Sequence, residues 1–106
     1  MLSAEDRGIA RVLGRRLTEV TAVLDLLVFG SRARGDAAAD ADLDVFVELE
    51  SVTPALRRRI TDIAWEVGFD LGRVITTVVA SRQDIEVGRF GGSPLLLAIQ
   101  RDGVRP

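Results

Sequence analysis

The chain has 106 residues, 47% of them hydrophobic, and a formal net charge of −2. Its length predicts one domain, residues 1–106, with enough apolar side chains for a core, and its negative charge argues against general nucleic-acid binding. Because the chain has no cysteine and no histidine, the sequence excludes disulfides, zinc sites with the usual ligands and imidazole acid–base chemistry.

The first expected element is an amphipathic helix that begins after Ser3. Ser3 can cap this helix, and the acidic residues Glu5 and Asp6 suit its first turn. Apolar residues then recur at helical spacing, while charged residues occupy the opposite face. The apolar positions are Ile9, Val12, Leu13, Leu17 and Val20. The pattern predicts a helix of about four turns that covers a sheet.

Two short apolar segments predict strands. Residues 23–29 are apolar except for Asp25, which is expected near an open end, and residues 43–48 alternate at their start. Between the segments, residues 31–34 can form one helical turn, and residues 36–41 have the composition of a loop. The connection is short, so it permits an antiparallel pair.

A second long helix and a third strand are expected next. Thr53 and Pro54 form a helix start, and Gly68 is the expected end. The apolar stripe of this helix, with Trp65 at the rim of the core, consists of Leu56, Ile60, Ile63, Ala64 and Val67. Residues 73–80 are rich in β-branched side chains and predict the strand.

Two short helices are expected near the C-terminus. Ser81 and Asp84 match a capping box for the first of them, which the glycines at 91–92 are expected to end. Ser93-Pro94 starts the second. The apolar side chains in this region, which either pack on the sheet or form a contact between copies, are Phe90, Leu95, Leu96 and Leu97.

The order of these elements predicts an α/β (α+β) fold in which helices cover a small sheet of three or more strands. No apolar run reaches the length of a membrane span, and the first residues do not resemble a signal peptide. We therefore expect a cytoplasmic protein without membrane contact. The basic run Arg57–Arg59 is expected on a solvated helix face, with a patch facing a protein or RNA as the alternative.

Two aspartates at the start of the second expected strand form a candidate metal site. Side chains alternate along a strand, so Asp42 and Asp44 point to the same side, with Cα atoms roughly 7 Å apart. Leu43 and Val45 point to the other side, into the core. Two carboxylates at this spacing can converge on one or two hard cations, and Mg²⁺ suits oxygen ligands and phosphate-bearing substrates.

The turn before these aspartates is a candidate phosphate site. Glycine at position 30 lets the backbone approach a ligand closely. The backbone N–H groups that follow and the Ser31 hydroxyl can donate hydrogen bonds to phosphate, and Arg32 and Arg34 can supply positive charge. Two competing motifs fail. Asp36-Ala37 stand where a Walker A loop needs lysine and serine or threonine, and Val45 and Ser51 stand where an EF-hand loop needs glycine and glutamate.

The combined pattern resembles the minimal nucleotidyltransferases of the DNA polymerase beta superfamily. Their signature is Gly-Ser-x-x-Arg-Gly, a short spacer, then Ser-Asp-x-Asp and a hydrophobic residue. This chain carries it as Gly30-Ser31-Arg32-Ala33-Arg34-Gly35 and Ala41-Asp42-Leu43-Asp44-Val45. The resemblance implies a polymerase-beta-like core with a small mixed sheet. It also implies transfer of a nucleoside monophosphate, AMP from ATP, to a hydroxyl acceptor.

The resemblance also implies roles for individual residues. Asp42 and Asp44 would be catalytic and would ligate one or two Mg²⁺ ions. The nucleotide would be bound by Gly30, Ser31, Arg32 and Arg34. Small members of the family often act as antitoxins that modify a helical toxin of the HEPN class with AMP, so the implied partners are a nucleoside triphosphate, such a toxin and a second copy of the chain. Nucleic acid is not among them.

Two departures from the family pattern bear on activity. Ala41 stands where the family usually has serine, and the strand expected at residues 74–79 has no acid where active members usually carry a third carboxylate. Thr76 is the expected replacement, and Asp70 is expected in an exposed turn unless the loop bends inward. Three functions therefore stay open: a Mg²⁺-dependent nucleotidyltransferase, a partner-binding module without turnover, and a nucleotide sensor.

Overall fold

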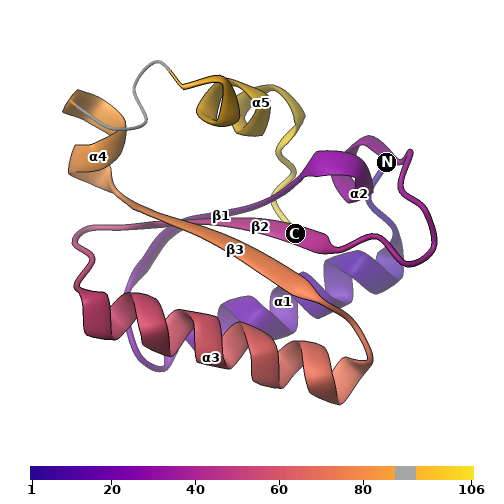
Figure 1. Ribbon diagram of the computed structural model, residues 1–106, viewed down its shortest axis with the longest axis horizontal. Helices are drawn as coiled ribbons and strands as arrows, with labels where there is room; N and C mark the ends of the chain where they lie inside the picture. The colour runs from indigo at the N-terminus through magenta and orange to yellow at the C-terminus, as the bar shows by residue number, and fades with distance from the viewer. Residues whose placement is uncertain (88–92) are drawn as a thin grey trace.

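The computed structural model describes residues 1–87 and 93–106. The described elements, shown in Figure 1, are α1 (Ala4–Thr18), β1 (Val23–Phe29), α2 (Gly30–Arg34), β2 (Leu43–Leu49), α3 (Pro54–Leu71), β3 (Ile75–Ser81), α4 (Arg82–Val87) and α5 (Pro94–Asp102). The mixed α/β fold expected from the sequence is therefore confirmed, and the first two strands lie where their patterns place them. Among the described residues, no helix combines the length and the apolar character needed to cross a membrane.

The three strands form a mixed sheet in the order β1-β2-β3. β1 and β2 are antiparallel, which the short connection between them permits, and β2 and β3 are parallel. The helix α3 provides the crossover that a parallel pair requires. The register aligns Phe29, Asp44 and Thr76 in one row across the sheet. This row brings the end of β1 next to the starts of β2 and β3.

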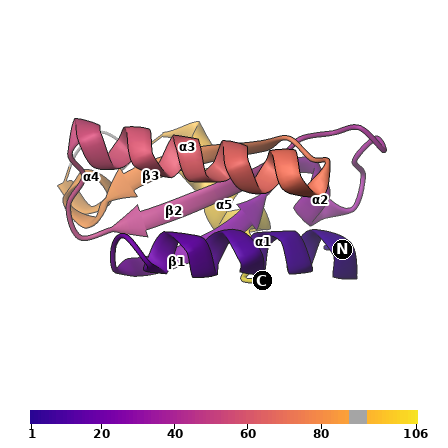
Figure 2. The same cartoon turned by 90° about the horizontal axis from the view of Figure 1, so that it is seen from below.

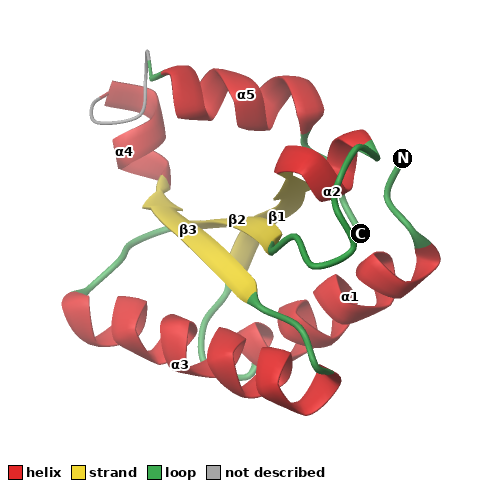
Figure 3. Ribbon diagram, turned by 45° about the vertical axis from the view of Figure 1, so that its right-hand side comes forward, coloured by secondary structure: helices red, strands yellow, loops and turns green. Residues whose placement is uncertain are grey.

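Helices cover both faces of the sheet, as Figures 2 and 3 show, with α1 and α3 on one face and α4 and α5 on the other. The α1/α3 face holds the main core, to which β2 contributes Leu43, Val45, Val47 and Leu49, all with no exposed surface. On the opposite face, Phe46 packs with Ala80 and Ile99. Since side chains alternate, Asp44 and Phe46 lie on the α5 face of β2. The apolar residues of β2 thus fix which way its aspartate points.

The expected helix starts are confirmed. The hydroxyls of Ser3, Thr53 and Ser93 accept hydrogen bonds from the backbone N–H three residues later, at 3.0–3.1 Å. Ser81 and Asp84 form the reciprocal pair of a capping box: the Asp84 N–H donates to the Ser81 hydroxyl, and the Ser81 N–H donates to the Asp84 carboxylate. The Ser81–Asp84 pair begins α4 directly where β3 ends.

Two helix ends differ from the sequence prediction. The first helix ends at Thr18, so Val20 lies beyond it and is 40% exposed. The third continues through Gly68 to Leu71 and ends where Gly72 takes the left-handed conformation, with φ of 69°. The N–H of Arg73 then donates to the Gly68 carbonyl at 2.8 Å. This closing turn delays the start of β3 from the predicted residue 73 to Ile75.

Trp65 does not lie at the rim of the core, where the sequence placed it. Its side chain is 68% exposed and stacks on Phe69, with ring centroids 5.2 Å apart. At the C-terminal end, Leu96 is buried, whereas Leu95 and Leu97 are exposed. The predictions for Phe90 and for a helix end at 91–92 lie outside the described residues.

Candidate metal and phosphate site

The two predicted carboxylates lie together at the start of β2. Asp44 stands in the row between Phe29 and Thr76, and the Thr76 hydroxyl donates to Oδ2 of Asp42 at 3.4 Å. The residues between and after the aspartates, Leu43 and Val45, are fully buried on the other face. Strand alternation therefore sets both carboxylates on the α5 face, where they are close enough to repel each other.

The α2 turn lies directly against this pair. Gly30 begins α2 with φ of 75°, and a Cβ atom placed on it would be only 2.6 Å from Oδ2 of Asp44. The site therefore needs glycine twice, for its backbone conformation and for the space that the carboxylate fills. Ser31 is the second residue of α2 and follows Gly30 directly. Figure 1 shows α2 between β1 and the loop that leads to β2.

The electrostatics of the corner favour a bound cation. Burial raises the pKa of the Asp44 carboxyl first, and the charge of Asp42 raises it further, whereas Arg34 lowers it. A cation bound between the carboxylates would relieve this repulsion. Among the described residues, no group of three acidic, histidine or cysteine side chains is placed to hold a metal. Two carboxylates fit Mg²⁺, which takes one or two from the protein and keeps water and phosphate oxygens as its other ligands.

The two arginines of the turn face different partners. The Arg34 side chain is 45% exposed and contacts Asp36 at 3.3 Å and Asp102 at 3.6 Å. Its positive charge is also close enough to Asp44 to lower the pKa of that carboxyl. Arg32 is turned away from the carboxylate pair, because its guanidinium is held by Asp6 and by the carbonyls of Ala39 and Ala41. The structure thus brings Asp42, Asp44, Gly30 and Arg34 together, with Ser31 next to Gly30 in the chain, whereas the contacts of Arg32 are to Asp6 and to two carbonyls of the following loop.

The missing third acid has a structural counterpart. Thr76 pairs with Asp44 in the parallel register and contacts Asp42, so it occupies the position beside the carboxylate pair on β3. Asp70 lies in the last turn of α3, where it is exposed. The third strand therefore presents a neutral hydroxyl at this position in place of a carboxylate.

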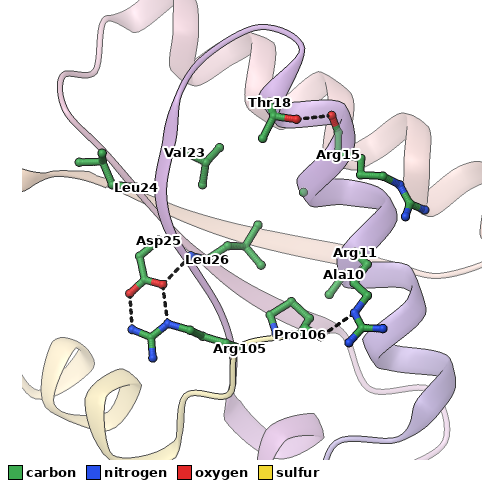
Figure 4. A pocket seen from close by; sticks show the side chains of 11 residues that line it. Ala10, Arg11, Arg15, Thr18, Val23, Leu24, Asp25, Leu26, Arg105 and Pro106 are labelled. Atoms are coloured by element: carbon green, nitrogen blue, oxygen red, sulfur yellow. Dashed lines mark hydrogen bonds and ion pairs between the residues drawn. The ribbon is translucent and has the colours of Figure 1, made fainter.

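A cavity of about 600 Å³ lies elsewhere, between α1, β1 and the C-terminal residues (Figure 4). It contains none of the predicted site residues. Asp25, which the sequence placed near an open end of the strand, lines this cavity and accepts two hydrogen bonds from Arg105, each 2.9 Å long. A structural ion pair therefore accounts for this acid.

Sequence reasoning did not anticipate the contacts of Asp6. Asp6 is 3% exposed and lies between Arg32 and Arg73. The sequence suggested only that its charge suits the first turn of α1. No local sequence pattern indicates these two ion pairs, because the partners of Asp6 stand 26 and 67 positions later in the chain.

Gly30→Ala is expected to disrupt the corner by displacing the Asp44 carboxylate, since the new methyl group would overlap Oδ2. Gly72→Ala is the matched control, because Gly72 has nearly the same φ but nothing within 4 Å of an added Cβ. Both variants should lose about 1–2 kcal/mol of stability from the left-handed backbone. Only Gly30→Ala should also weaken Mg²⁺·ATP binding measured by calorimetry. Equal binding by the two variants would contradict this geometry.

Known proteins resemble this chain both in sequence family and in fold. A family model described as a nucleotidyltransferase domain matches residues 8–87, and no curated protein matches the chain. A chain of a toxin–antitoxin crystallised with AMP-PNP shares the fold with a TM-score of 0.62 and 16% identity, over 97% of this chain and 72% of that one.

Two further solved structures have the same fold. One, assigned as a nucleotidyltransferase from Sulfolobus solfataricus, has a TM-score of 0.54 and 15% identity, over 93% of this chain and 77% of the other. The second, assigned as a minimal nucleotidyltransferase, has a TM-score of 0.53 and 24% identity, over 97% and 90%. At these identities the likeness concerns the fold, so roles for individual residues depend on the geometry described above.

Proposed function

The chain belongs to the nucleotidyltransferase domain family, and from this premise we propose that it transfers AMP from ATP to a hydroxyl group on a partner protein. The observation that carries the proposal is the single corner shared by Asp42, Asp44 and the Gly30-Ser31 turn, in which the Asp44 carboxylate lies against Gly30. The carboxylate pair would provide ligands for the metal ion, and the glycine turn in contact with it would provide hydrogen-bond donors for the phosphates of a metal-bound triphosphate.

Each residue has a defined task in this proposal. Asp42 and Asp44 would hold Mg²⁺, which when bound neutralises phosphate charge and polarises the reacting oxygens. The Ser31 hydroxyl and adjacent N–H groups would donate to phosphate oxygens, and Arg34 would supply positive charge from the α5 side. The acceptor oxygen then bonds to the α-phosphorus, the bond from that phosphorus to the bridging oxygen breaks, pyrophosphate leaves, and the acceptor proton passes to solvent. The protein contributes mainly position and charge.

A protein acceptor is supported by the openness of this corner. Asp42 and Thr76 are exposed, so a large substrate can reach the carboxylate pair. The toxin–antitoxin that shares the fold was crystallised with AMP-PNP, which supports a toxin as the partner and ATP as the donor here. We propose a toxin of the HEPN class.

The test is to incubate the chain with ATP labelled at the α-phosphate, Mg²⁺ and a purified HEPN-class protein. The proposal expects label on the partner, seen as a mass increase of one AMP, and no label when Mg²⁺ is withheld. A partner that binds the chain tightly yet stays unlabelled at every Mg²⁺ concentration would contradict the enzyme.

A partner-binding module without turnover is the second candidate function. Thr76 beside the carboxylates favours it, because a hydroxyl there is neither a metal-binding carboxylate nor a base. The exposed Trp65–Phe69 stack on α3 gives such a module a contact surface, since large aromatic side chains often dominate binding energy. In that case partner binding should be indifferent to Asp42→Asn and Asp44→Asn.

Trp65→Ser is expected to weaken partner binding at least about 30-fold if this stack is the contact, because truncation of an aromatic anchor at the centre of an interface costs about 2 kcal/mol or more. Leu97→Ser is the control, since Leu97 is also an exposed apolar residue but lies on α5. Partner affinity can be measured by biolayer interferometry. Equal losses in the two variants would argue against a specific contact through α3.

A further inference from the structure

An ion-pair network centred on the buried Asp6 lies next to the carboxylate corner. Asp6, in the first turn of α1, is 3% exposed. Its Oδ2 lies 3.5 Å from Nη1 of Arg32, and its Oδ1 lies 2.8 Å from Nη2 of Arg73, as an ion pair that is not aligned as a hydrogen bond. The two arginine side chains are 15% and 13% exposed. Three charged groups are thus withdrawn from solvent together, which needs mutual compensation.

Arg32 connects this network to the backbone before Asp42. Its Nε and Nη2 both donate to the Ala41 carbonyl, at 3.1 and 3.0 Å, and Nη2 also donates to the Ala39 carbonyl at 2.8 Å. The Ala41 carbonyl belongs to the peptide that leads directly into Asp42. One planar guanidinium therefore holds that peptide with two hydrogen bonds and the Ala39 carbonyl with a third, in a segment that has no regular secondary structure of its own.

Arg73 connects the same network to the start of β3. It follows the turn that closes α3, and the carbonyl of the next residue, Val74, accepts from the Leu43 N–H at 2.9 Å. Two residues further on, Thr76 donates to Asp42. Through Arg32 and Arg73, Asp6 therefore links the loop that leads into Asp42 with the start of the strand that carries Thr76.

We propose that Asp6, Arg32 and Arg73 are positioning residues, which set the direction of the Asp42 carboxylate from behind by fixing the peptide before it and the strand beside it. The catalytic meaning of this network rests on the proposed function. The structural part of the proposal does not rest on that function, because it concerns only how rigidly residues 39–43 are held in the protein without a ligand. The network also assigns Arg32 a role away from the nucleotide.

Arg32→Lys is the direct test. Lysine retains a positive charge for Asp6 but cannot direct three N–H donors at two carbonyls. Arg57→Lys is the matched control, since Arg57 also donates to a backbone carbonyl, that of Val79 at 3.1 Å, far along the sheet from Asp42. Two readouts are compared: amide hydrogen exchange at Ala41 and Leu43, whose N–H groups are bonded to Ala38 and Val74, and binding of Mn²⁺ with ATP followed by electron paramagnetic resonance.

In Arg32→Lys, amide exchange at Ala41 and Leu43 should become faster, and affinity for Mn²⁺·ATP should fall at least about tenfold, as for other groups that orient metal ligands. Arg57→Lys should change neither quantity. Arg73→Lys is the second variant, with the same expectation, if Arg32→Lys does not fold. Wild-type exchange at both amides in a folded variant would overturn the proposal. If the wild-type chain itself does not bind Mn²⁺·ATP, the proposed function fails, while the exchange measurement still decides the positioning claim.

Discussion

Asp44→Asn is expected to lower the rate of AMP transfer by at least about 100-fold without lowering the stability of the chain. The amide keeps the shape of the side chain but removes the charge that would hold Mg²⁺. Loss of activity with retained stability separates a functional carboxylate from a structural one, because a structural ion pair loses stability when it is neutralised.

The sign of the stability change follows from the pKa of Asp44. Burial, and then the charge of Asp42, raise this pKa above its ordinary value of 3.8. The ionised carboxylate therefore destabilises the folded chain at neutral pH, and that cost disappears as the pH falls through the raised pKa. Neutralising the residue should leave the melting temperature unchanged or higher, as calorimetry can measure.

Asp70→Asn is the matched control for this variant, since Asp70 is the exposed acid that the sequence offered as an alternative third carboxylate. It should retain wild-type transfer and wild-type stability. A melting temperature several degrees lower in Asp44→Asn would show instead that its carboxylate supports the fold.

Asp6→Ala is expected to destabilise the chain by roughly 3–5 kcal/mol, because it leaves two largely buried guanidinium groups without their shared carboxylate, and among the described residues Arg73 keeps only the exposed Glu5 at 3.8 Å. Glu66→Ala is the matched control: Glu66 also pairs with an arginine, Arg16, at 2.6 Å, but both side chains are more than one-third exposed. That pair should contribute no more than about 1 kcal/mol. Urea unfolding gives both values, and similar losses in the two variants would contradict a buried, compensated network around Asp6.

The strands and the carboxylate pair were accessible to sequence reasoning for a simple physical reason. A strand has a period of two, so the apolar residues at positions 43, 45, 47 and 49 fix both the element and the side on which Asp44 points. Helix starts were equally readable at Ser3 and Thr53, because a capping hydroxyl acts on an N–H only three residues away. Both features depend on residues that are close together in the sequence, so the sequence pattern alone predicts them.

The remaining features depend on distant parts of the chain. The last turn of α3 carries exposed apolar side chains, so the pattern could not show that the helix passes Gly68 and ends at Gly72. Arg32 has the composition of a phosphate ligand, yet its donors are used by Asp6 and by two carbonyls of the following loop. Trp65 has the size of a core residue, but α3 turns it toward solvent. Whether such a side chain contacts a ligand, other residues or solvent depends on the tertiary structure, which the local sequence does not determine.

The most direct test of the account is calorimetric titration of ATP into the wild-type chain and into a variant carrying both Asp42→Asn and Asp44→Asn, each with and without Mg²⁺. We expect the wild-type chain to bind ATP only with Mg²⁺, and the double variant to fold but to lose this binding. ATP binding of equal strength in the two proteins, or wild-type binding that is independent of Mg²⁺, would contradict the claim that these two carboxylates and the Gly30-Ser31 turn form one metal–phosphate site.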